Sequence, residues 1–407
     1  MAKIGIYGGS FNPPHLGHML AARACMELLG LDRVILVPAA IPPHKTLAEG
    51  SADGEARLRM TELASEGLES FTVSRIELDR AGPSYTVDTL RSFRAQYPGD
   101  QLYLLMGTDM FLSFLTWRQP EVIASLAAVV CMARVRADEA LRSQLQAQKA
   151  AIRQTLGAEP IVLDNDCLEV SSTQVRRLLF FGLTDGLLDA RVRDYILQEG
   201  LYGTCQDCRG LPYEALERVS LSLHKAKRRP HALGVAQTAA ELAERYGADV
   251  TDARRAGILH DVTKALGPEE QRALCAKWQL SVTPFELEQA KLLHAKTGAA
   301  AADRLFGENE AVCTAISYHT TGRAGMTLLE KILYIADYIE PCRDFPGVEE
   351  LRAATRRDLD EGVLLGIQTT LDLLQSRGQP ACSDSLEARA WLMETGRRSR
   401  GAEEPTP

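Results

Sequence analysis

One segment near the amino terminus limits most strongly the folds open to this chain. It runs Gly8-Gly9-Ser10-Phe11-Asn12-Pro13-Pro14-His15-Leu16-Gly17-His18, between a short apolar run, Lys3 to Tyr7, and a helical apolar pattern, Leu16 to Leu29. The pattern predicts a strand, a glycine-containing turn and a helix. Glycines let a nucleotide approach the backbone, and N–H groups at a helix start favour a phosphate. His15 and His18 are three residues apart, so both can point at one ligand.

The same alternation of strand-like and helical stretches continues to about residue 200. The further strand-like runs are Arg33 to Val37, Phe71 to Leu78, Gln101 to Met106, Ala127 to Met132 and Ile161 to Leu163. We therefore expect an α/β fold, a doubly wound parallel sheet of Rossmann-like type. In such a sheet ligands bind beyond the carboxyl ends of the strands.

The alternation of strand-like and helical stretches ends after residue 203. Strand signals almost vanish, and from Tyr213 to about Arg377 the pattern is helical, which favours an all-α second domain. A chain of 407 residues also exceeds what one core normally serves. We predict a first domain over residues 1–203, a linker over 204–212, a second domain over 213–380, and a C-terminal helix with a frayed tail over 381–407.

The composition excludes several classes of protein. A hydrophobic fraction of 45% with 25% charged residues is that of an ordinary globular protein. The net charge of −8 argues against a nucleic-acid partner, and the basic run Lys225 to Arg229 is too short to reverse this. With neither a membrane-length apolar run nor a signal peptide at the start, we expect no membrane partner and a cytoplasmic location. Nine scattered cysteines fit a reduced compartment, and Cys205 and Cys208 lack the second pair of a zinc site.

The first motif resembles the HxGH signature of the nucleotidylyltransferase superfamily. Its longer form is similar to the text GGTFDPPHxGH of the bacterial nicotinate-nucleotide adenylyltransferases. Ser10 and Asn12 stand where Thr and Asp are usual, and both keep a small hydrogen-bonding side chain. The resemblance makes His15 and His18 the catalytic residues and implies nucleotide contacts at Gly8, Gly9 and Ser10.

A second phosphate-binding segment is predicted at Glu169 to Arg177, where hydroxyl residues open a helix and an arginine follows one turn later. Read alone, this is a capped helix with a solvated arginine. Beside the first motif it resembles the ISSTxIR segment of the same family. The resemblance implies that Ser172, Thr173 and Arg176 hold the distal phosphates of ATP.

Further segments resemble the acceptor site of that family. Lys45, in the loop Ile41 to Lys45, can meet an acceptor phosphate as a point charge. Ser84 to Leu90 is similar to SYTxDTL, with Thr86 at the nicotinate end. The resemblance also implies roles in nucleotide binding, in stacking on the pyridine ring and in phosphate contact for Gly107, Asp109, Trp117 and Arg134. Without it, Trp117 is a core residue.

The implied reaction joins ATP, carried with Mg²⁺, to nicotinate mononucleotide and gives deamido-NAD and pyrophosphate. Such a displacement needs donors around the reacting phosphorus and no protein nucleophile. Sister families with the same signature use other phosphorylated acceptors, such as pantetheine phosphate, and supply the alternative.

The second half carries a set of histidines and aspartates inside helical stretches. Its members are His231, His260, Asp261, His294, His319 and Asp337. Imidazoles with carboxylates form a ligand set suited to iron, manganese or a similar divalent ion. Scattered histidines in a helical domain are usually structural, so the order of the whole set matters.

That order is similar to the HD phosphohydrolase superfamily, in which His231, His260, Asp261 and Asp337 match the ligands of the first metal. His294 and His319 resemble the extra ligands of two-metal members, with Asp261 bridging two ions, expected to be iron. Over residues 213–377 the text resembles the bacterial symmetrical diadenosine tetraphosphate hydrolases. Lys264, otherwise a solvated lysine, is then a catalytic residue that neutralises phosphate charge, and Arg343 is a second candidate for that task.

The sequence thus predicts a bifunctional enzyme whose partners are small nucleotides: ATP, nicotinate mononucleotide and diadenosine tetraphosphate, which is cut into two ADP. An alternative from another class is a rear half that senses a nucleotide and regulates the front half without turnover. The sequence leaves open the native metal, the choice between nicotinate and nicotinamide mononucleotides, homo-oligomer formation and coupling between the halves.

Overall fold

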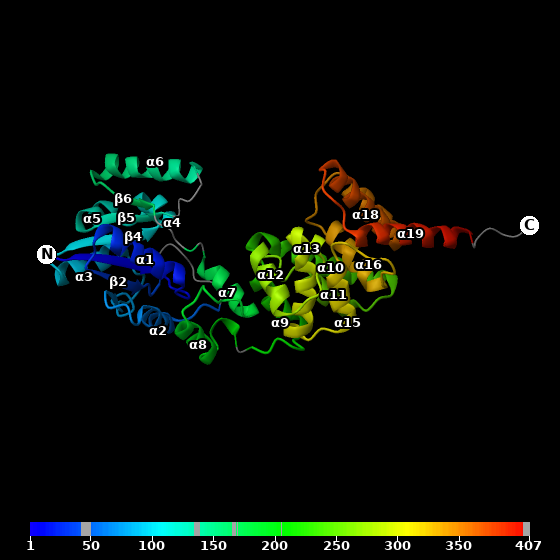
Figure 1. Cartoon of the computed structure of the whole chain (residues 1–407), viewed down its shortest axis with the longest axis horizontal. Coiled ribbons are helices and arrows are strands. Elements are labelled where there is room, and N and C mark those ends of the chain that lie inside the picture. The colour runs from blue at the N-terminus through cyan, green and yellow to red at the C-terminus, as the bar shows by residue number, and fades with distance from the viewer. Residues whose placement is uncertain (42–49, 134–138, 165–167, 169, 205, 402–407) are drawn as a thin grey trace, which may run out of the picture. The chain divides into compact units, whose positions relative to one another are not determined.

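The computed structural model describes residues 1–41, 50–133, 139–164, 168, 170–204 and 206–401. The chain divides into two compact units, Met1–Gln206 and Asp207–Pro407 (Figure 1). The division falls within the predicted linker. In the described residues no helix is long and apolar enough to cross a membrane.

The first unit contains a parallel sheet, as predicted. Its described strands are β1 (Lys3–Gly9), β2 (Arg33–Pro38), β3 (Phe71–Val73), β4 (Gln101–Gly107), β5 (Ala128–Ala133) and β6 (Ile161–Asp164), in the order β3-β2-β1-β4-β5-β6. All neighbouring pairs are parallel, with Ile6 opposite both Ile35 of β2 and Leu104 of β4. The order reverses between β1 and β4, so the ends of these two strands form the ligand-binding crevice expected of a doubly wound sheet.

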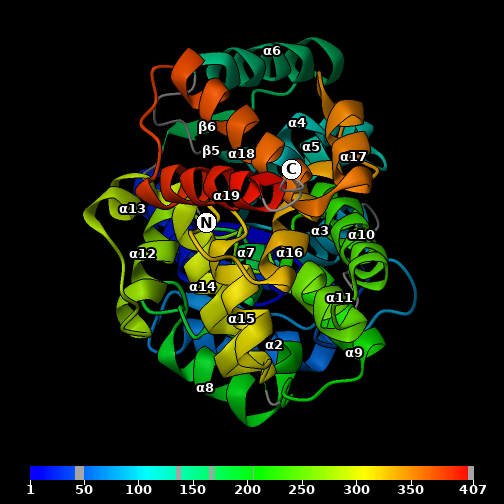
Figure 2. The same ribbon diagram turned by 90° about the vertical axis from the view of Figure 1, so that its right-hand side faces the viewer.

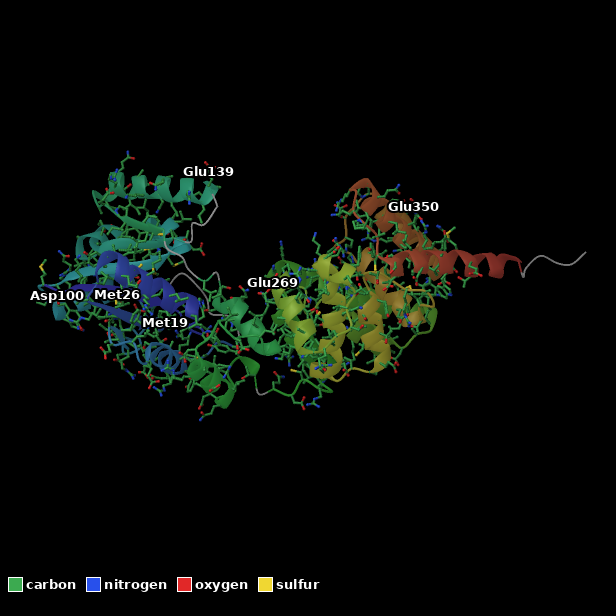
Figure 3. The ribbon with its side chains drawn as sticks, in the orientation of Figure 1. Met19, Met26, Asp100, Glu139, Glu269 and Glu350 are labelled. Atoms are coloured by element: carbon green, nitrogen blue, oxygen red, sulfur yellow. The ribbon has the colours of Figure 1, made fainter. Side chains whose placement is uncertain are left out.

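Helices cover both faces of the sheet. The helices on one face are α1 (Leu16–Leu29), α2 (Gly54–Ser65), α7 (Ser172–Phe181) and α8 (Ala190–Gln198). Those on the other are α3 (Thr86–Gln96), α4 (Thr108–Leu112), α5 (Pro120–Leu126) and α6 (Glu139–Leu156). On α1, Met19 belongs to the first core and Met26, two turns later, packs against it (Figure 3). Ile4 and Ile6 of β1 belong to the second core. Short 3₁₀ turns, η1 (Phe114–Thr116) and η2 (Leu201–Gly203), complete the unit.

One strand is shorter than the sequence indicates. We expected a strand from Phe71 to Leu78, but β3 ends at Val73 because it is an edge strand that pairs only with β2. The next residues form turns, in which the N–H groups of Leu78 and Asp79 donate to the carbonyl of Arg75. Glu77 is consequently buried beneath α3 and not placed on a sheet face.

The second unit is helical throughout its described residues, as predicted. Its first helices are α9 (Tyr213–Leu223), α10 (Arg229–Tyr246), α11 (Val250–Leu259), α12 (Pro268–Lys277) and α13 (Pro284–Glu288). They are followed by α14 (Leu293–Ala301), α15 (Glu310–Tyr318), α16 (Leu328–Ile339), α17 (Val348–Arg357), α18 (Leu359–Ser376) and α19 (Ser383–Gly401). Single turns, η3 (Ala226–Arg228) and η4 (Ala290–Leu292), precede α10 and α14, and a π-helical turn, η5 (Ala302–Phe306), follows α14. Helices α10, α11, α15 and α16 pack against one another and hold the second site (Figure 2).

Candidate functional site

The two histidines of the first motif lie together at the start of α1. His15 is the N-cap residue and is 2% exposed, and its ring stacks on that of His18 with centroids 3.6 Å apart. The backbone N–H of His15 donates to Nδ1 of His18 at 3.2 Å. Because Nδ1 accepts, the neutral His18 ring carries its proton on Nε2. That nitrogen is therefore a donor for a phosphate oxygen.

The second phosphate segment contacts the first directly. The hydroxyl of Ser172 donates to the carbonyl of Pro13 at 2.9 Å, and Nη1 of Arg176 donates to the carbonyl of Asn12 at 2.5 Å. The other Arg176 nitrogen, Nη2, donates to Oγ1 of Thr173 at 3.2 Å. These three residues come from α7, more than 150 positions along the chain from the histidines. The structure thus brings together both segments that the sequence assigned to ATP.

Glycines mark where backbone and ligand approach closely. A Cβ added at Gly17 would lie 2.8 Å from the carbonyl oxygen of Leu168, so the HxGH glycine lets the chain before α7 pack on α1. At Gly8 and Gly107, which lie at the carboxyl ends of β1 and β4, a Cβ would meet no atom of the described residues within 4 Å. Within the described part of the chain, the space beside these two glycines is therefore open. Gly9 packs on the Phe11 ring, and Ser10 is half-buried.

Among the predicted acceptor residues, Thr86 and Asp109 lie in the first turns of α3 and α4, and Trp117 follows the short turn η1. Thr86 is the first residue of α3 and is half-buried, while Asp109 is exposed in the first turn of α4. Trp117 is half-buried, packs its ring edge-on to Phe114, and donates from Nε1 to Oγ of Ser113 at 3.4 Å. Lys45 and Arg134 lie outside the described residues.

Two residues of this site were not identified from the sequence. Oδ1 of Asn12 accepts from the hydroxyl of Tyr202 at 2.8 Å and from the N–H of Ala52, while Nδ2 donates to Oγ of Ser51 at 2.7 Å. Arg57 is 1% exposed and donates to the carbonyls of Ser10, Ala39, Ala40 and Ala52. Burial lowers the pKa of Arg57. Asn12 and Arg57 thus fix the loops that follow β1 and β2.

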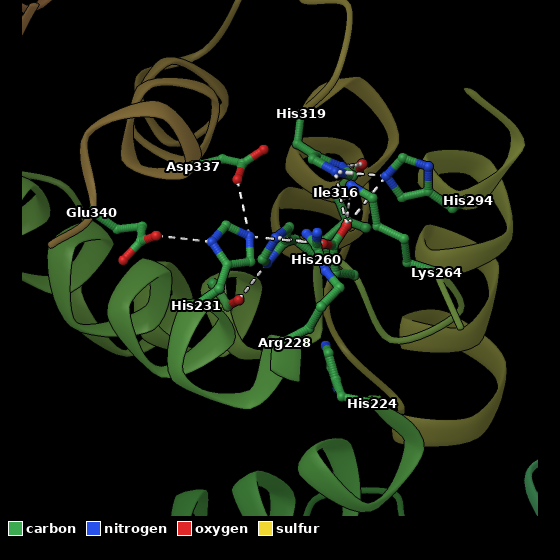
Figure 4. A network of polar contacts seen from close by, with 12 residues as sticks. His224, Arg228, His231, His260, Lys264, His294, Ile316, His319, Asp337 and Glu340 are labelled. Carbon is green, nitrogen blue, oxygen red and sulfur yellow. Dashed lines mark hydrogen bonds and ion pairs between the residues drawn. The ribbon is translucent and has the colours of Figure 1, made fainter. Parts of the chain in front are cut away.

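The predicted ligands of the second site converge on two adjacent points (Figure 4). At the first, Nε2 of His231 lies 3.1 Å from Oδ1 of Asp337, and Nε2 of His260 lies 3.4 Å from Oδ2 of Asp261. At the second, Nε2 of His294 lies 3.2 Å from Oδ1 of Asp261 and 3.2 Å from Nε2 of His319. The two carboxylate oxygens of Asp261 therefore face different histidine pairs, as a bridging ligand requires.

Hydrogen bonds on the far side of each ring show that a cation fits this cluster. Nδ1 of His260, His294 and His319 faces the carbonyl oxygens of Gly257, Lys291 and Ile316 at 2.6, 2.5 and 2.7 Å, and Nδ1 of His231 faces Glu340. In the neutral form of each ring, Nδ1 carries the proton that these acceptors require, which leaves Nε2 with a lone pair directed inward. The buried Nε2 atoms of His231 and His260 have no hydrogen-bond partner in the described part of the chain. Lone pairs facing carboxylates are the donor set of a divalent metal.

The charges of the cluster agree with that conclusion. Burial opposes ionisation of Asp261 and Asp337, but nearby imidazoles and cationic side chains hold the pKa of both carboxyls well below the usual range. Burial likewise opposes a charge on His260, yet Asp261 raises its pKa. Burial lowers the pKa of His319 to about 4. Two ionised buried carboxylates require positive charge beside them.

Basic side chains also enter the second site. Nζ of Lys264 lies 3.0 Å from Oδ1 of Asp261, and Nη2 of Arg343 lies 2.5 Å from Oδ1 of Asp337, so both predicted residues reach the cluster. Arg228, which the sequence analysis treated only as part of a short basic run, pairs with Oδ2 of Asp261. Its partner is 33 residues away, so no local pattern identifies it. His224, the C-cap residue of α9, is also buried, and its Nδ1 faces the carbonyl oxygen of Ser220 at 2.8 Å.

Comparisons with known proteins separate along the same division. The family described as cytidylyltransferase-like matches residues 6–178, and the HD domain family matches residues 228–342. A protein of Thermus thermophilus named probable nicotinate-nucleotide adenylyltransferase is 52% identical over 132 residues, which cover 32% of this chain and 69% of that protein. One of the same name from Bordetella petrii is 41% identical over 204 residues, 50% of this chain and 100% of that protein.

The second half has a relative of its own. The symmetrical bis(5'-nucleosyl)-tetraphosphatase of Bacillus subtilis is 42% identical over 164 residues, which cover 40% of this chain and 88% of that protein. The chain therefore belongs to two families at once, as a fusion of a nicotinate-nucleotide adenylyltransferase of the cytidylyltransferase-like fold with an HD-domain protein of the symmetrical tetraphosphatase group.

Proposed function

We propose that the first unit transfers the adenylyl group of ATP to nicotinate mononucleotide and so makes deamido-NAD and pyrophosphate. The observation that carries this proposal is the contact between the two ATP segments, Ser172 to Pro13 and Arg176 to Asn12, beside the stacked histidines. The names of the relatives from Thermus thermophilus and Bordetella petrii support the choice of reaction.

In this reaction a phosphate oxygen of the mononucleotide attacks the α-phosphorus of ATP, and the bond to the bridging oxygen of pyrophosphate breaks. Negative charge builds on the phosphoryl oxygens during the displacement. The Nε2–H of His18, with His15 beside it, donates to those oxygens. Arg176 and the hydroxyls of Ser172 and Thr173 hold the departing pyrophosphate, and Mg²⁺ bound with ATP neutralises part of its charge.

The acceptor is assigned to the side chains around the ends of α3 and α4. Thr86 holds the nicotinate end, Asp109 and Gly107 contact the nucleotide, and the half-buried Trp117 stacks on the pyridine ring. Lys45 and Arg134 remain predicted phosphate contacts. A flat aromatic ring favours a pyridine over a flexible acceptor such as pantetheine phosphate.

For the second unit we propose symmetrical hydrolysis of diadenosine tetraphosphate to two ADP. The observation that carries this proposal is the convergence of four imidazoles and two buried carboxylates, with three basic side chains in contact with those carboxylates. The name of the Bacillus subtilis relative supports the substrate.

The ligand set assigns one ion to His231, His260, Asp261 and Asp337 and a second to Asp261, His294 and His319, with iron as the proposed native metal. Bound ions of this kind lower the pKa of a coordinated water and neutralise charge on phosphoryl oxygens. Water attacks one central phosphorus, and the bond to the middle bridging oxygen breaks. Lys264, Arg228 and Arg343 offer guanidinium and ammonium groups to the phosphates on either side.

The test for the first unit is His18→Ala in the full chain, assayed for deamido-NAD from ATP and nicotinate mononucleotide. Loss of a phosphate donor at the reacting centre should lower kcat by about 10²- to 10³-fold. Leu20→Ala, an exposed position on the same helix, is the matched control and should leave the rate unchanged. Near-normal turnover by the His18 variant would disprove the assignment. Transfer to pantetheine phosphate but not to the mononucleotide would favour the sister families.

The test for the second unit separates the nucleotides formed from diadenosine tetraphosphate by the metal-loaded full chain. Symmetrical cleavage yields ADP alone, whereas asymmetrical cleavage yields ATP and AMP. Asp337→Asn should abolish ADP release while the His18→Ala variant retains it. Tight binding of the dinucleotide without any product would instead identify a regulatory module.

A further inference from the structure

One histidine of the second site is supported differently from the other three. His260, His294 and His319 each direct Nδ1 at the carbonyl oxygen of the residue three positions earlier in the chain. His231 directs Nδ1 at the carboxylate of Glu340, with 3.0 Å between Nδ1 and Oε1 (Figure 4). The two candidate metal positions therefore differ in the group that accepts a hydrogen bond from Nδ1 of their histidines: a carboxylate at His231 and a backbone carbonyl at the other three.

The Glu340 carboxylate is held in place by the structure around it. The side chain is 1% exposed, at the end of α16, and Oε2 accepts from the N–H of Cys342 at 2.6 Å. Gly234 lies one turn after His231 on α10, and a Cβ added there would stand 2.4 Å from Oε2 of Glu340. The glycine therefore leaves the space that Oε2 of Glu340 occupies in this arrangement.

A carboxylate behind a histidine does more than a carbonyl does. It fixes the tautomer and the orientation of the ring. Its full negative charge also makes the opposite nitrogen more basic, and so a stronger electron-pair donor to a metal ion. At His231 the opposite nitrogen is Nε2, which faces Asp337 at 3.1 Å. Arg343 lies 4.0 Å from Oε1 of Glu340 and donates its hydrogen bonds to Asp337, so the shorter side-chain contact of this oxygen is the one at 3.0 Å to His231.

We infer that Glu340 is a positioning residue for one of two unequal metal positions. Position A, formed by His231, His260, Asp337 and Oδ2 of Asp261, depends on Glu340 for its affinity. Position B, formed by Asp261, His294 and His319, does not. The inference rests on the metal site of the proposed function, but not on the identity of the hydrolysed substrate.

The experiment titrates Mn²⁺ into the full chain after removal of bound metal with a chelator, and follows free Mn²⁺ by electron paramagnetic resonance. Glu340→Gln keeps the shape of the side chain and removes the charge. Gly234→Ala is a second variant, which displaces the carboxylate without changing it. Glu330→Gln is the matched control, because Glu330 is 1% exposed on the same helix but pairs with Arg323 instead of a histidine.

We expect the wild type and the control to bind two Mn²⁺ ions. Loss of the outer carboxylate should weaken one of the two binding steps by about 10- to 100-fold and leave the other unchanged. Gly234→Ala should reproduce this selective loss. Unfolding of the metal-free variants, followed by circular dichroism, should match that of the metal-free wild type.

Two results would overturn the inference. One is a pair of dissociation constants in Glu340→Gln equal to those of the wild type, and the other is an equal loss at both positions. A wild-type chain that binds no Mn²⁺ would refute the metal site itself. If Glu340→Gln weakens only one of the two Mn²⁺-binding steps, but the wild-type chain releases no ADP from diadenosine tetraphosphate, only the proposed hydrolysis is refuted.

Discussion

The hydroxyl of Tyr202 donates a 2.8 Å hydrogen bond to Oδ1 of Asn12, and so joins the end of the first unit to the loop that carries its histidines. Burial raises the pKa of Tyr202, which keeps this hydroxyl protonated and able to donate. Tyr202 has φ of 59°, and Phe11, the residue before Asn12, has φ of 43°. Aromatic residues rarely adopt this left-handed region, and surrounding contacts must hold them there. The hydrogen bond therefore joins one strained residue to the chain neighbour of another, beside the proposed ATP site.

Tyr202→Phe should show what this contact contributes. The variant keeps the ring and removes one of the two donors to a buried acceptor, so the free energy of unfolding should fall by about 1 kcal/mol. Adenylyl transfer should slow by about tenfold, less than the 10²-fold cost of a full ångström of misplacement. Tyr103→Phe removes a hydroxyl whose hydrogen bond to Gln101 is exposed, and should change neither quantity. If Tyr202→Phe and Tyr103→Phe had the same free energy of unfolding and the same rate of adenylyl transfer, this would contradict a role for the hydrogen bond between Tyr202 and Asn12.

Alanine substitutions at two glycines of the first motif should have different effects on stability and activity. In Gly17→Ala the new methyl group meets the Leu168 carbonyl, a backbone atom, so we expect about 1–3 kcal/mol of destabilisation as well as lost activity. In Gly8→Ala the methyl group meets no atom of the described residues within 4 Å, so stability should be retained. The KM for ATP should nevertheless rise, because the methyl group enters the space above β1. Denaturant unfolding and steady-state kinetics on both variants check this pair, and a destabilised Gly8→Ala would be the contrary result.

Glu77 predicts a pH dependence of stability. Burial raises the pKa of its carboxyl above 4.5, although the Thr89 hydroxyl, which donates to Oε1 at 2.8 Å, partly opposes the shift. Because the pKa of Glu77 is higher in the folded chain than in the unfolded chain, the stability contributed by the protonated carboxyl is fully present below the pKa of the unfolded state. It is lost as pH rises through the pKa of the folded state. Glu77→Gln, which cannot ionise, should therefore gain stability over the wild type on going from pH 4 to pH 7. The exposed Glu69→Gln variant should show no such trend, and a flat difference for Glu77→Gln would argue against the burial effect.

Metal removal should destabilise the second unit specifically. A ligand that binds only the folded state adds about 2.7 kcal/mol at 100 times its dissociation constant. Calorimetry of the full chain should show the transition of the second unit moving upward when Mn²⁺ is added to chelator-treated protein, while the transition of the first unit stays in place. Asp337→Asn should abolish most of the shift. An upward shift of the same size in Asp337→Asn would place the binding elsewhere.

Much of the fold was open to prediction because its signals are local. The strand Lys3–Tyr7 and the helix Leu16–Leu29 follow from apolar spacing within each segment, and β1 and α1 have nearly these bounds. The predicted strand from Phe71 to Leu78 was too long because an apolar run does not reveal which strand lies at the sheet edge. Partner strands, and not the run itself, decide where an edge strand ends.

The candidate residues differ in the same way. His15, His18 and the histidines and aspartates of the second half are recognisable from short motifs and their order. Arg228, Glu340 and Tyr202 are not, because their partners lie 33, 109 and 190 residues away. Nothing near Glu340 in the sequence indicates that its carboxylate lies behind His231.

The amino-acid sequence alone determined the two kinds of architecture, the families and the types of side chain available for chemistry, since each depends on patterns a few residues long. Only the tertiary structure decided which nitrogen of each imidazole faces inward and which carbonyl or carboxylate stands behind it. Those choices depend on packing between helices distant in sequence, such as α10 against α16, because a hydrogen bond forms only where the fold brings donor and acceptor within about 3 Å.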